Sequence, residues 1–214
     1  MRMLLLCGSF WLLTAGGAAA FTSLPVVSSS SYEPHVVTSP VTAKRVYLGT
    51  LEGFPDMYEI ASPEPFTLDL ALSTLVDSPV KPALSVIIVE AGVSGVTEVS
   101  RINHDAENWQ LKRESITGLS LLAGPEYQSE LAAGTYWIEI STPDNNGQYL
   151  LTLGHQPLDT GYFATLQSIA QTYEFVGQSK WRMIRSPYVY WPLSSGLIIC
   201  LLIVIWRERK RIWA

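Results

Sequence analysis

Cysteine is scarce in this sequence, and its position excludes a disulfide framework for most of the chain. Only two cysteines occur among the 214 residues, Cys7 and Cys200, and each lies in an apolar run near one end. Residues 21 to 190 contain none. A domain formed by this region must therefore be stabilised by an ordinary hydrophobic core.

Charge is scarce as well. Charged residues make up 15% of the sequence and hydrophobic residues 48%, with a mean hydropathy of +0.20, which is too apolar for a disordered chain. The net charge of −5 excludes a generally basic nucleic-acid binder, so we predict no nucleic-acid partner. Residues 21 to 190 hold 9 basic and 18 acidic residues, whereas residues 207 to 214 hold 4 basic and 1 acidic. The two regions thus differ in the sign of their charge.

The common motifs of catalytic, metal and cofactor sites are also missing. His35, His104 and His155 are far apart, and none has a metal-ligand spacing. No phosphate-binding loop, C-x-x-C pair or dinucleotide fingerprint occurs. We therefore predict no catalytic, cofactor-binding or metal-binding residue, no cofactor and no enzyme activity.

Three short segments only imitate functional motifs. Gly92 to Val96 departs from the G-x-S-x-G nucleophile elbow because Val96 replaces its last glycine, and we predict a hairpin turn. Asp144 to Gly147 lacks the spacing of a calcium loop and is predicted to be a plain turn. His104 and Asp105 are predicted to be polar loop residues.

The N-terminal 20 residues have the order of a secretory signal peptide. Arg2 precedes an apolar run, and small residues follow up to Ala20. We predict a signal peptide over residues 1–20, cleaved before Phe21. A membrane anchor or a buried helix is the alternative, and the apolar run is short for a span. Lipidation at Cys7 is disfavoured because Leu6 occupies the position of a small residue.

The C-terminal apolar run predicts a membrane span. Tyr188 to Trp206 contains 19 residues without a charge and is followed directly by the basic residues that begin at Arg207. Such a helix crosses most of a bilayer core, and its aromatic ends suit the two interfaces. A buried helix of a soluble protein is the alternative. Because the signal peptide exports the preceding region, the basic tail over residues 207–214 is predicted to be cytoplasmic.

The exported region is predicted to be a β-sandwich. Residues 21–43 are rich in Ser, Thr, Val and Pro and are predicted to be a flexible lead-in. Residues 44–154 show short alternating runs between turn residues, which is typical of a two-sheet antiparallel sandwich of about eight strands. The expected strands are 46–48, 57–60, 66–73, 84–90, 96–102, 109–112, 135–141 and 148–153.

The juxtamembrane segment, residues 155–187, contains an amphipathic helix. Apolar residues recur at three or four positions between Tyr162 and Val176, flanked by Gly161 and Gly177. The helix either packs on the sandwich or lies in the outer membrane interface. We favour the interface because aromatic residues occupy the apolar side and the span begins about ten residues later.

The last two expected strands, 135–141 and 148–153, are predicted to form a hairpin, and it resembles the final hairpin of the bacterial pre-peptidase C-terminal domain. The matching stretches are Leu131 to Ile140, LAAGTYWIEI, and Gly147 to Leu153, GQYLLTL. The resemblance implies a jelly-roll-like sandwich displayed outside the cytoplasm. It covers about 25 residues and carries over no calcium ligands, since no cluster of aspartates of that kind occurs here.

The favoured function is a single-pass membrane protein that displays a non-catalytic interaction or scaffolding domain. Its predicted partners are membrane lipid, through Tyr188 to Trp206 and the amphipathic helix, and a protein or envelope polymer of unknown identity. A module that binds carbohydrate or envelope polymer is the alternative, with Trp109, Tyr127 and Trp137 as a sugar platform, although burial in the core is favoured for them. A hydrolase with an unrecognised site is a third, weaker alternative.

Overall fold

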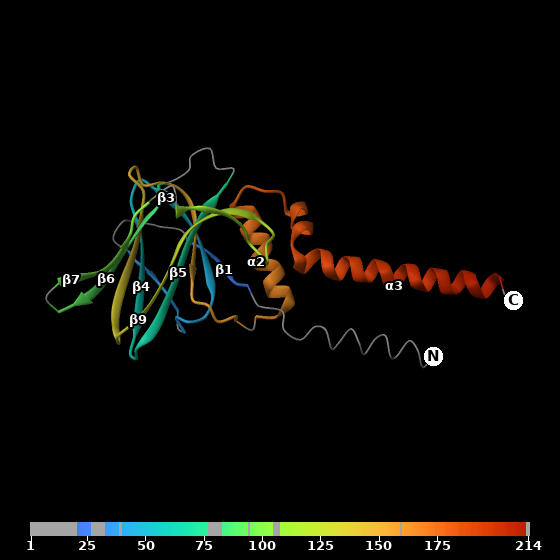
Figure 1. Cartoon of the computed structure of the whole chain (residues 1–214), viewed down its shortest axis with the longest axis horizontal. Coiled ribbons are helices and arrows are strands. Elements are labelled where there is room, and N and C mark those ends of the chain that lie inside the picture. The colour runs from blue at the N-terminus through green and yellow to red at the C-terminus, as the bar shows by residue number, and fades with distance from the viewer. Residues whose placement is uncertain are drawn as a thin grey trace.

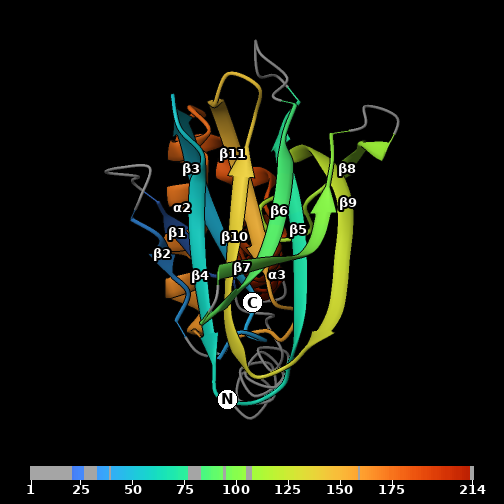
Figure 2. The same ribbon diagram turned by 90° about the vertical axis from the view of Figure 1, so that its left-hand side faces the viewer.

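A computed structural model describes residues 21–26, 33–38, 40–76, 83–93, 95–104, 108–158 and 160–212. The predicted signal peptide lies outside these residues. The described chain forms two facing β-sheets, one helix against the outer side of one sheet, and a long helix that projects away from that side (Figure 1). The layers are seen face-on in Figure 2, where the helices lie behind both sheets.

Sheet A has six strands. Their spatial order is β1 (Ser23–Pro25), β3 (Arg45–Glu52), β11 (Asn146–Leu153), β5 (Phe66–Leu75), β9 (Ser120–Leu131) and β8 (Gln110–Arg113).

Sheet B has five strands. Their order is β2 (His35–Val36), β4 (Asp56–Ser62), β10 (Gly134–Ser141), β6 (Ser85–Gly92) and β7 (Gly95–Ile102). The pairs among β3 to β11 are antiparallel, as the alternation predicts, whereas β1 and β2 pair with β3 and β4 in parallel. The fold is thus a β-sandwich of two mixed sheets.

The inner core lies between the sheets. Because successive side chains of a strand point to opposite faces, each strand supplies alternate apolar residues to it. The sequence pattern identifies these residues correctly: Leu68, Leu70 and Leu72 of β5 and Tyr136, Ile138 and Ile140 of β10 are buried there. Burying such side chains supplies about 1.5 to 3 kcal/mol each, before the entropy of folding is subtracted.

The outer core lies on the opposite side of sheet A. The helix α2 (Gly161–Phe175) covers this side, and its Ile169 and Tyr173 are buried against Val46, Leu48 and Leu150 of the sheet. The membrane-interface prediction for this helix is therefore wrong, and the alternative of packing on the sandwich is correct. The alternate residues of β3 and β11 that point away from the inner core need a cover, and the apolar side of the helix provides it.

The strand pair with the pre-peptidase resemblance does not form a hydrogen-bonded hairpin. β10 pairs with β4 and β6 in sheet B, whereas β11 pairs with β3 and β5 in sheet A. The connection at 142–145 therefore crosses from one sheet to the other. Both strands still point their alternate residues into the inner core, so the alternation could not distinguish a crossing from a hairpin.

One long strand, β9, was not expected from the sequence. Gly124 and Pro125 lie in its middle, and both residues normally argue against a strand. Ala71 and Ser73 of β5 face Glu126 and Ala123, so a register shift accommodates the two residues. A β-bulge thus explains how a long strand contains a proline.

The described parts of the predicted flexible lead-in are ordered. Phe21 and Val37 are buried, and β1 and β2 extend the two sheets at their edges. The Ser23 hydroxyl donates a hydrogen bond of 2.8 Å to the Ser168 carbonyl of α2. Parallel edge strands need no nearby turn, and this is why the composition of residues 21–43 did not indicate them.

Candidate functional site

The C-terminal part of the described chain is the long helix α3 (Pro187–Ile212). An 18-residue window within its stretch Pro187–Arg209 has a mean hydropathy of 2.1, and the stretch is long and apolar enough to cross a membrane. None of that apolar window is buried by the rest of the chain. A buried helix of a soluble protein would be covered by other parts of the chain. The exposure of this window therefore argues against that alternative.

The first turn of α3 is fixed to the sandwich. The Ser186 hydroxyl is buried and donates a hydrogen bond of 2.5 Å to the Ile116 carbonyl. The Tyr162 hydroxyl of α2 donates a hydrogen bond of 2.9 Å to the Tyr188 carbonyl, and the two tyrosine rings stack with centroids 6.4 Å apart. The helix is therefore attached through specific contacts rather than through a free linker.

Gly118 is essential to this junction. Its φ of +74° favours glycine, and a Cβ there would lie 2.7 Å from the Arg185 carbonyl oxygen. The loop that contains it is held by Glu114, whose carboxylate accepts hydrogen bonds from the Thr117 hydroxyl and from the amides of Ile116 and Thr117. The backbone at Gly118 can therefore pack directly on the backbone at Arg185, just before α3 begins.

Between α2 and α3 lies the short 3-10 helix η2 (Lys180–Arg185). Its Trp181 and Ile184 side chains are exposed, Trp181 by 89%. Arg182 and Arg185 are exposed too, and they act together with Arg113 on the nearby Tyr173. Burial raises the pKa of Tyr173, and the three positive charges oppose that rise. This end of the molecule is thus apolar and cationic at once.

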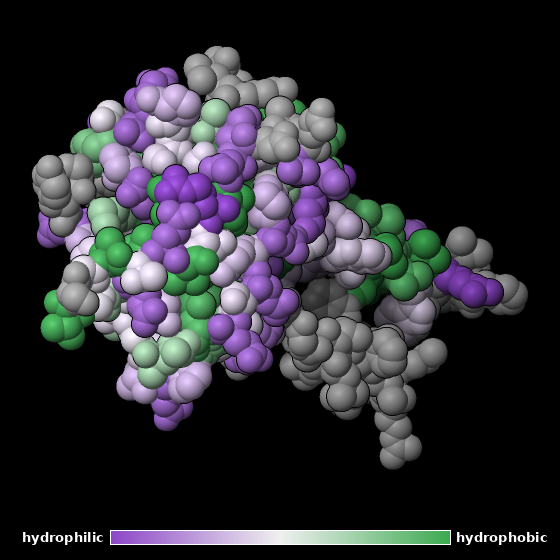
Figure 3. Space-filling view, turned by 60° about the vertical axis from the view of Figure 1, so that its left-hand side comes forward, coloured by the Kyte–Doolittle hydropathy of each residue, from purple (hydrophilic) through white to green (hydrophobic). Residues whose placement is uncertain are grey.

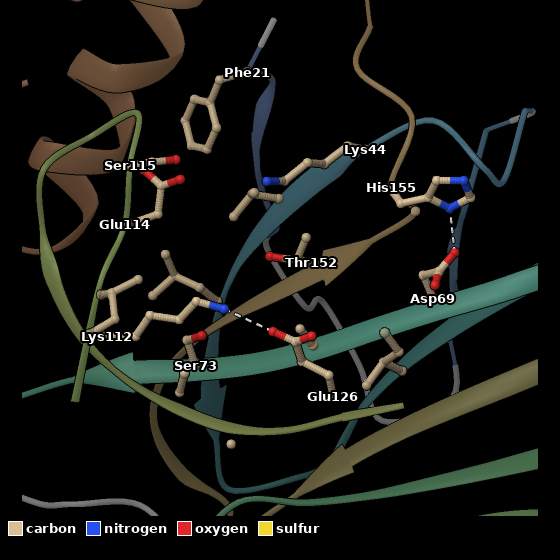
Figure 4. Close-up of a pocket in the computed structure, with 18 of the residues that line it drawn as sticks. Phe21, Lys44, Asp69, Ser73, Lys112, Glu114, Ser115, Glu126, Thr152 and His155 are labelled. Atoms are coloured by element: carbon tan, nitrogen blue, oxygen red, sulfur yellow. Dashed lines mark hydrogen bonds and ion pairs between the residues drawn. The ribbon is translucent and has the colours of Figure 1, made fainter. Parts of the chain in front are cut away.

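A groove lies on the outer side of sheet A beside α2 (Figure 4). Its volume is about 610 Å³. Small side chains form much of its floor, namely Ala71, Ser73, Ala123, Gly124 and Thr152. They leave a hollow because α2 covers only part of the sheet.

The charges around the groove are partly neutralised. Lys112 pairs with Glu126 at 2.9 Å and holds the pKa of that carboxyl below its usual range, and Asp69 pairs with His155. Lys44 and Arg113 also line the groove, and neither forms an ion pair with another described residue. Two cationic groups therefore remain available to a ligand with negative or polar groups.

A buried polar chain crosses the inner core. The Tyr149 hydroxyl donates a hydrogen bond of 2.5 Å to Asp56, and the Tyr58 and Tyr149 hydroxyl oxygens lie 2.8 Å apart. All three side chains are almost fully buried, and burial raises the pKa of both tyrosines well above the usual range. Gly49 faces Tyr149 across β3 and β11 and leaves space for its ring. Because solvent and ligands do not reach this cluster, we assign it a role in stabilising the fold.

The three aromatic residues considered as a sugar platform do not share one exposed surface. Trp109 is in the inner core and Tyr127 packs against that core. Trp137 lies on β10, and its indole nitrogen donates a hydrogen bond of 3.2 Å to Glu59. They form no continuous row, so this platform is absent. The outward side of the sandwich, turned partly toward the viewer in Figure 3, mixes apolar and charged side chains.

The remaining motif predictions can be compared with the structure directly. β6 and β7 form an antiparallel hairpin with Gly92 opposite Gly95, as predicted. Asn145 has a φ of +46° in the predicted turn after β10. His104 lies near Trp109, with ring centroids 5.8 Å apart, whereas Asp105 is outside the described residues. No group of three metal-binding side chains occurs in the part of the chain that the structure describes.

No protein-family model matches this chain, and no curated protein matches it. Several solved structures are similar to it, including the following two. One is the pre-peptidase C-terminal domain of a collagenase from Bacillus anthracis, with a TM-score of 0.30 and 12% identity over 65% of this chain and 97% of that chain. The other is PliG from Aeromonas hydrophila, a periplasmic inhibitor of g-type lysozyme, with a TM-score of 0.33 and 12% identity over 63% of this chain and 96% of that chain. The first of these structures belongs to the family that the last two strands of the sandwich resemble in sequence, the pre-peptidase C-terminal domain.

Proposed function

We propose that the chain is a single-pass membrane protein that displays a non-catalytic β-sandwich outside the cytoplasm as an interaction or scaffolding module. The observation that carries this proposal is the uncovered apolar helix α3, whose first turn is fixed to a complete sandwich. A helix of this kind requires a nonpolar surrounding that the protein itself does not supply. The predicted signal peptide supports export of the sandwich.

The fixed junction also supports different roles for the two sheets, with sheet A on the membrane side and sheet B on the partner side. α3 projects from the side of sheet A and α2, so sheet B faces away from the bilayer (Figures 1 and 2). Its β7 strand exposes Val96 and Val99 beside the ion pair of Glu98 and Arg101. A partner in solution or in the cell envelope would meet this side first.

Topology is the first test. Epitope tags are placed at Ser30 and after Ala214, and protease is added outside intact cells, with the outer membrane opened where the host has one. We expect loss of the tag at Ser30 and survival of the tag after Ala214. The reverse pattern, or loss of both tags, contradicts the proposal.

The outward face of sheet B is the second test. A photo-crosslinking amino acid at Val96 should give specific adducts in living cells, whereas the same group at Glu130 of β9, on sheet A, serves as the matched control. Adducts found only from the sheet A position would contradict the assignment of sheet B as the partner surface.

A module that binds an envelope polymer is the second candidate function, and the groove is the observation that favours it. Ser73 and Thr152 supply hydroxyl groups, and Lys44 and Arg113 supply cations. Binding of the detergent-solubilised full-length protein to isolated envelope polysaccharide tests it. If a Lys44→Gln/Arg113→Gln variant binds as well as the wild type, the groove is not the site.

A further inference from the structure

The 3-10 helix η2 has three sides with three different properties. A 3-10 helix has three residues per turn, so side chains at positions i and i+3 share one side. Lys180 and Met183 share the first side, Trp181 and Ile184 the second, and Arg182 and Arg185 the third. The sequence KWRMIR thus places one pair of similar residues on each of two sides.

The first side faces the protein. Lys180 forms an ion pair of 2.9 Å with Glu174 of α2, and Met183 packs against the outer core. The contact of Met183 with the outer core orients this side of η2 toward the sandwich, and the exposed ion pair lies beside it. The apolar side with Trp181 and Ile184 and the cationic side with Arg182 and Arg185 are therefore directed away from the sandwich.

Neither outward side is covered by protein. Trp181 is 89% exposed and Ile184 is 58% exposed, which is unusual for residues of this size on a folded domain. Arg182 and Arg185 form no ion pair with any residue in the described ranges. The segment thus presents adjacent apolar and cationic surfaces that no described residue covers.

The location of η2 identifies the partner that fits both surfaces. Ser186 alone separates η2 from α3, and Ser186 is itself fixed to Ile116, so η2 is held at the end of α3 nearest the sandwich (Figure 1). If α3 spans a bilayer, this end lies at the membrane surface. Tryptophan side chains favour that depth, and arginine side chains there meet lipid phosphates.

We propose that η2 is a binding surface for anionic phospholipid headgroups of the leaflet that α3 enters, with Trp181 and Ile184 in the interface and Arg182 and Arg185 on the phosphates. This inference rests on the proposed function, because it requires α3 to be in the membrane. It adds that lipid charge, through η2 and its fixed junction, holds sheet A against the bilayer and sheet B away from it.

Hydrogen exchange of the full-length protein in lipid nanodiscs tests the proposal. Amide exchange of residues 180–185 is compared between nanodiscs of phosphatidylcholine alone and nanodiscs containing phosphatidylglycerol. Each arginine near an anionic surface contributes about fivefold to binding, so we expect exchange to slow by about tenfold or more with the anionic lipid. Arg182→Gln/Arg185→Gln should abolish most of this difference, and Trp181→Ala/Ile184→Ala should reduce protection in both lipids.

The matched control is Val96→Ala/Arg101→Gln, which removes an exposed apolar residue and an exposed arginine from sheet B. This variant should exchange like the wild type at 180–185. All substituted side chains are exposed, so the thermal unfolding midpoint in detergent should remain unchanged for each variant.

The possible results separate two failures. Equal exchange at 180–185 in both lipids, with residues 195–204 of α3 protected, overturns the lipid-binding role of η2 and leaves the membrane span intact. Rapid exchange at 195–204 in every nanodisc overturns the span and hence both proposals. If soluble glycerophosphate protects 180–185 equally well in phosphatidylcholine nanodiscs, the surface binds a free anion and the lipid assignment is wrong.

Discussion

The two cores of this protein differ in where their residues come from. The inner core takes alternate side chains from strands of both sheets and encloses the polar chain of Asp56, Tyr149 and Tyr58. The outer core combines the remaining sides of β3 and β11 with α2, the loop at 116–119, Met183 of η2 and Tyr188 of α3. The inner core thus defines the sandwich, and the outer core defines how the sandwich is attached to α3.

This difference shows how one sheet can have two roles. The β3 and β11 strands of sheet A are largely buried on both sides, so most of their residues are constrained by one core or the other. Sheet B is buried on one side only, and its outward residues remain free to vary or to bind. Substitutions in the two cores should therefore have separable effects, on the stability of the fold and on the attachment of the anchor.

The largest effect is expected in the inner core, for Gly49→Ala. A Cβ at this position would lie 2.2 Å from the ring of Tyr149, which is fully buried and cannot move aside. We expect a loss of about 3 kcal/mol of unfolding free energy, at the upper end for an overpacked core. Chemical denaturation in detergent, followed by near-ultraviolet circular dichroism, measures it.

Gly92→Ala provides the control for that substitution. Its Cβ would lie 3.5 Å from the Gly95 carbonyl oxygen, which is an ordinary contact. Its cost should stay within about 1 kcal/mol, the range of a simple glycine replacement in a strand. If Gly49→Ala and Gly92→Ala lose the same free energy, glycine is not needed at position 49 to leave room for the ring of Tyr149.

The second effect separates the outer core from the inner one. Gly118→Ala places a Cβ 2.7 Å from the Arg185 carbonyl oxygen and also requires a φ of +74°, whereas Gly161→Ala requires a φ of +73° with no atom within 4 Å. We expect about 1 kcal/mol of backbone strain in each variant and about 1 to 2 kcal/mol more for Gly118→Ala.

Hydrogen exchange at the Ser186 amide measures the attachment itself. It should rise in Gly118→Ala and remain unchanged in Gly161→Ala, while the inner-core amides stay protected in both. If the two variants behave alike at Ser186, the close approach of the loop to Arg185 does not fix the anchor.

The third effect is a pH dependence that originates in the inner core. Tyrosine ionises near pH 10 in an unfolded chain, but burial raises the pKa of Tyr58 and Tyr149, so both stay protonated in the folded state. Their contribution to stability is therefore complete below pH 10 and falls as the pH rises above it. Each tyrosine should contribute a slope of about 1.4 kcal/mol per pH unit.

Tyr149→Phe removes one of these two groups. We expect it to lower the slope of unfolding free energy between pH 10 and pH 11.5 by about 1.4 kcal/mol per unit, in addition to a constant loss from the missing hydrogen bond to Asp56. Denaturant titrations at several pH values measure the slope. An unchanged slope would mean that Tyr149 ionises in the folded protein as readily as in the unfolded chain.

The smallest effect is expected outside both cores, in the groove. Lys112 and Glu126 form an ion pair, but their side chains are 64% and 70% exposed. Water and salt screen such a pair, so Lys112→Gln should change the unfolding free energy by less than about 0.5 kcal/mol. Denaturation at low and high salt measures it. A loss above 1 kcal/mol would show that the groove residues belong to the stabilising framework.

Some of the fold follows from local patterns. Alternation identified the inward residues of β5, β10 and β11, because the strand period of two is a property of the backbone. The run from Tyr188 to Trp206 identified the membrane-length helix for an equally local reason, since length and apolarity alone decide whether a helix can span. The absence of cysteine from residues 21 to 190 required an ordinary core, and the two clusters of buried residues provide it.

Other features depended on contacts between distant residues. The alternation of β10 and β11 is the same whether they pair in one sheet or cross between two, and only their partners β4, β6, β3 and β5 decide between these arrangements. The proline in β9 argued against a strand there, and only the bulge in the pairing with β5 shows how the strand accommodates it. The apolar side of α2 suits a bilayer or a sheet equally well, and only the contacts with Val46, Leu48 and Leu150 show that it covers sheet A.

The sequence by itself therefore determined an acidic, cysteine-free β domain followed by a span of membrane length, since composition and short-range periodicity carry that information. The tertiary structure alone decided which sheet α2 covers, that the groove lies beside it, and that Ser186 and Gly118 fix α3 to the sandwich. These features arise from contacts across 67 to 145 positions of sequence, from Gly118 with Arg185 to Ser23 with Ser168, and no local pattern encodes them.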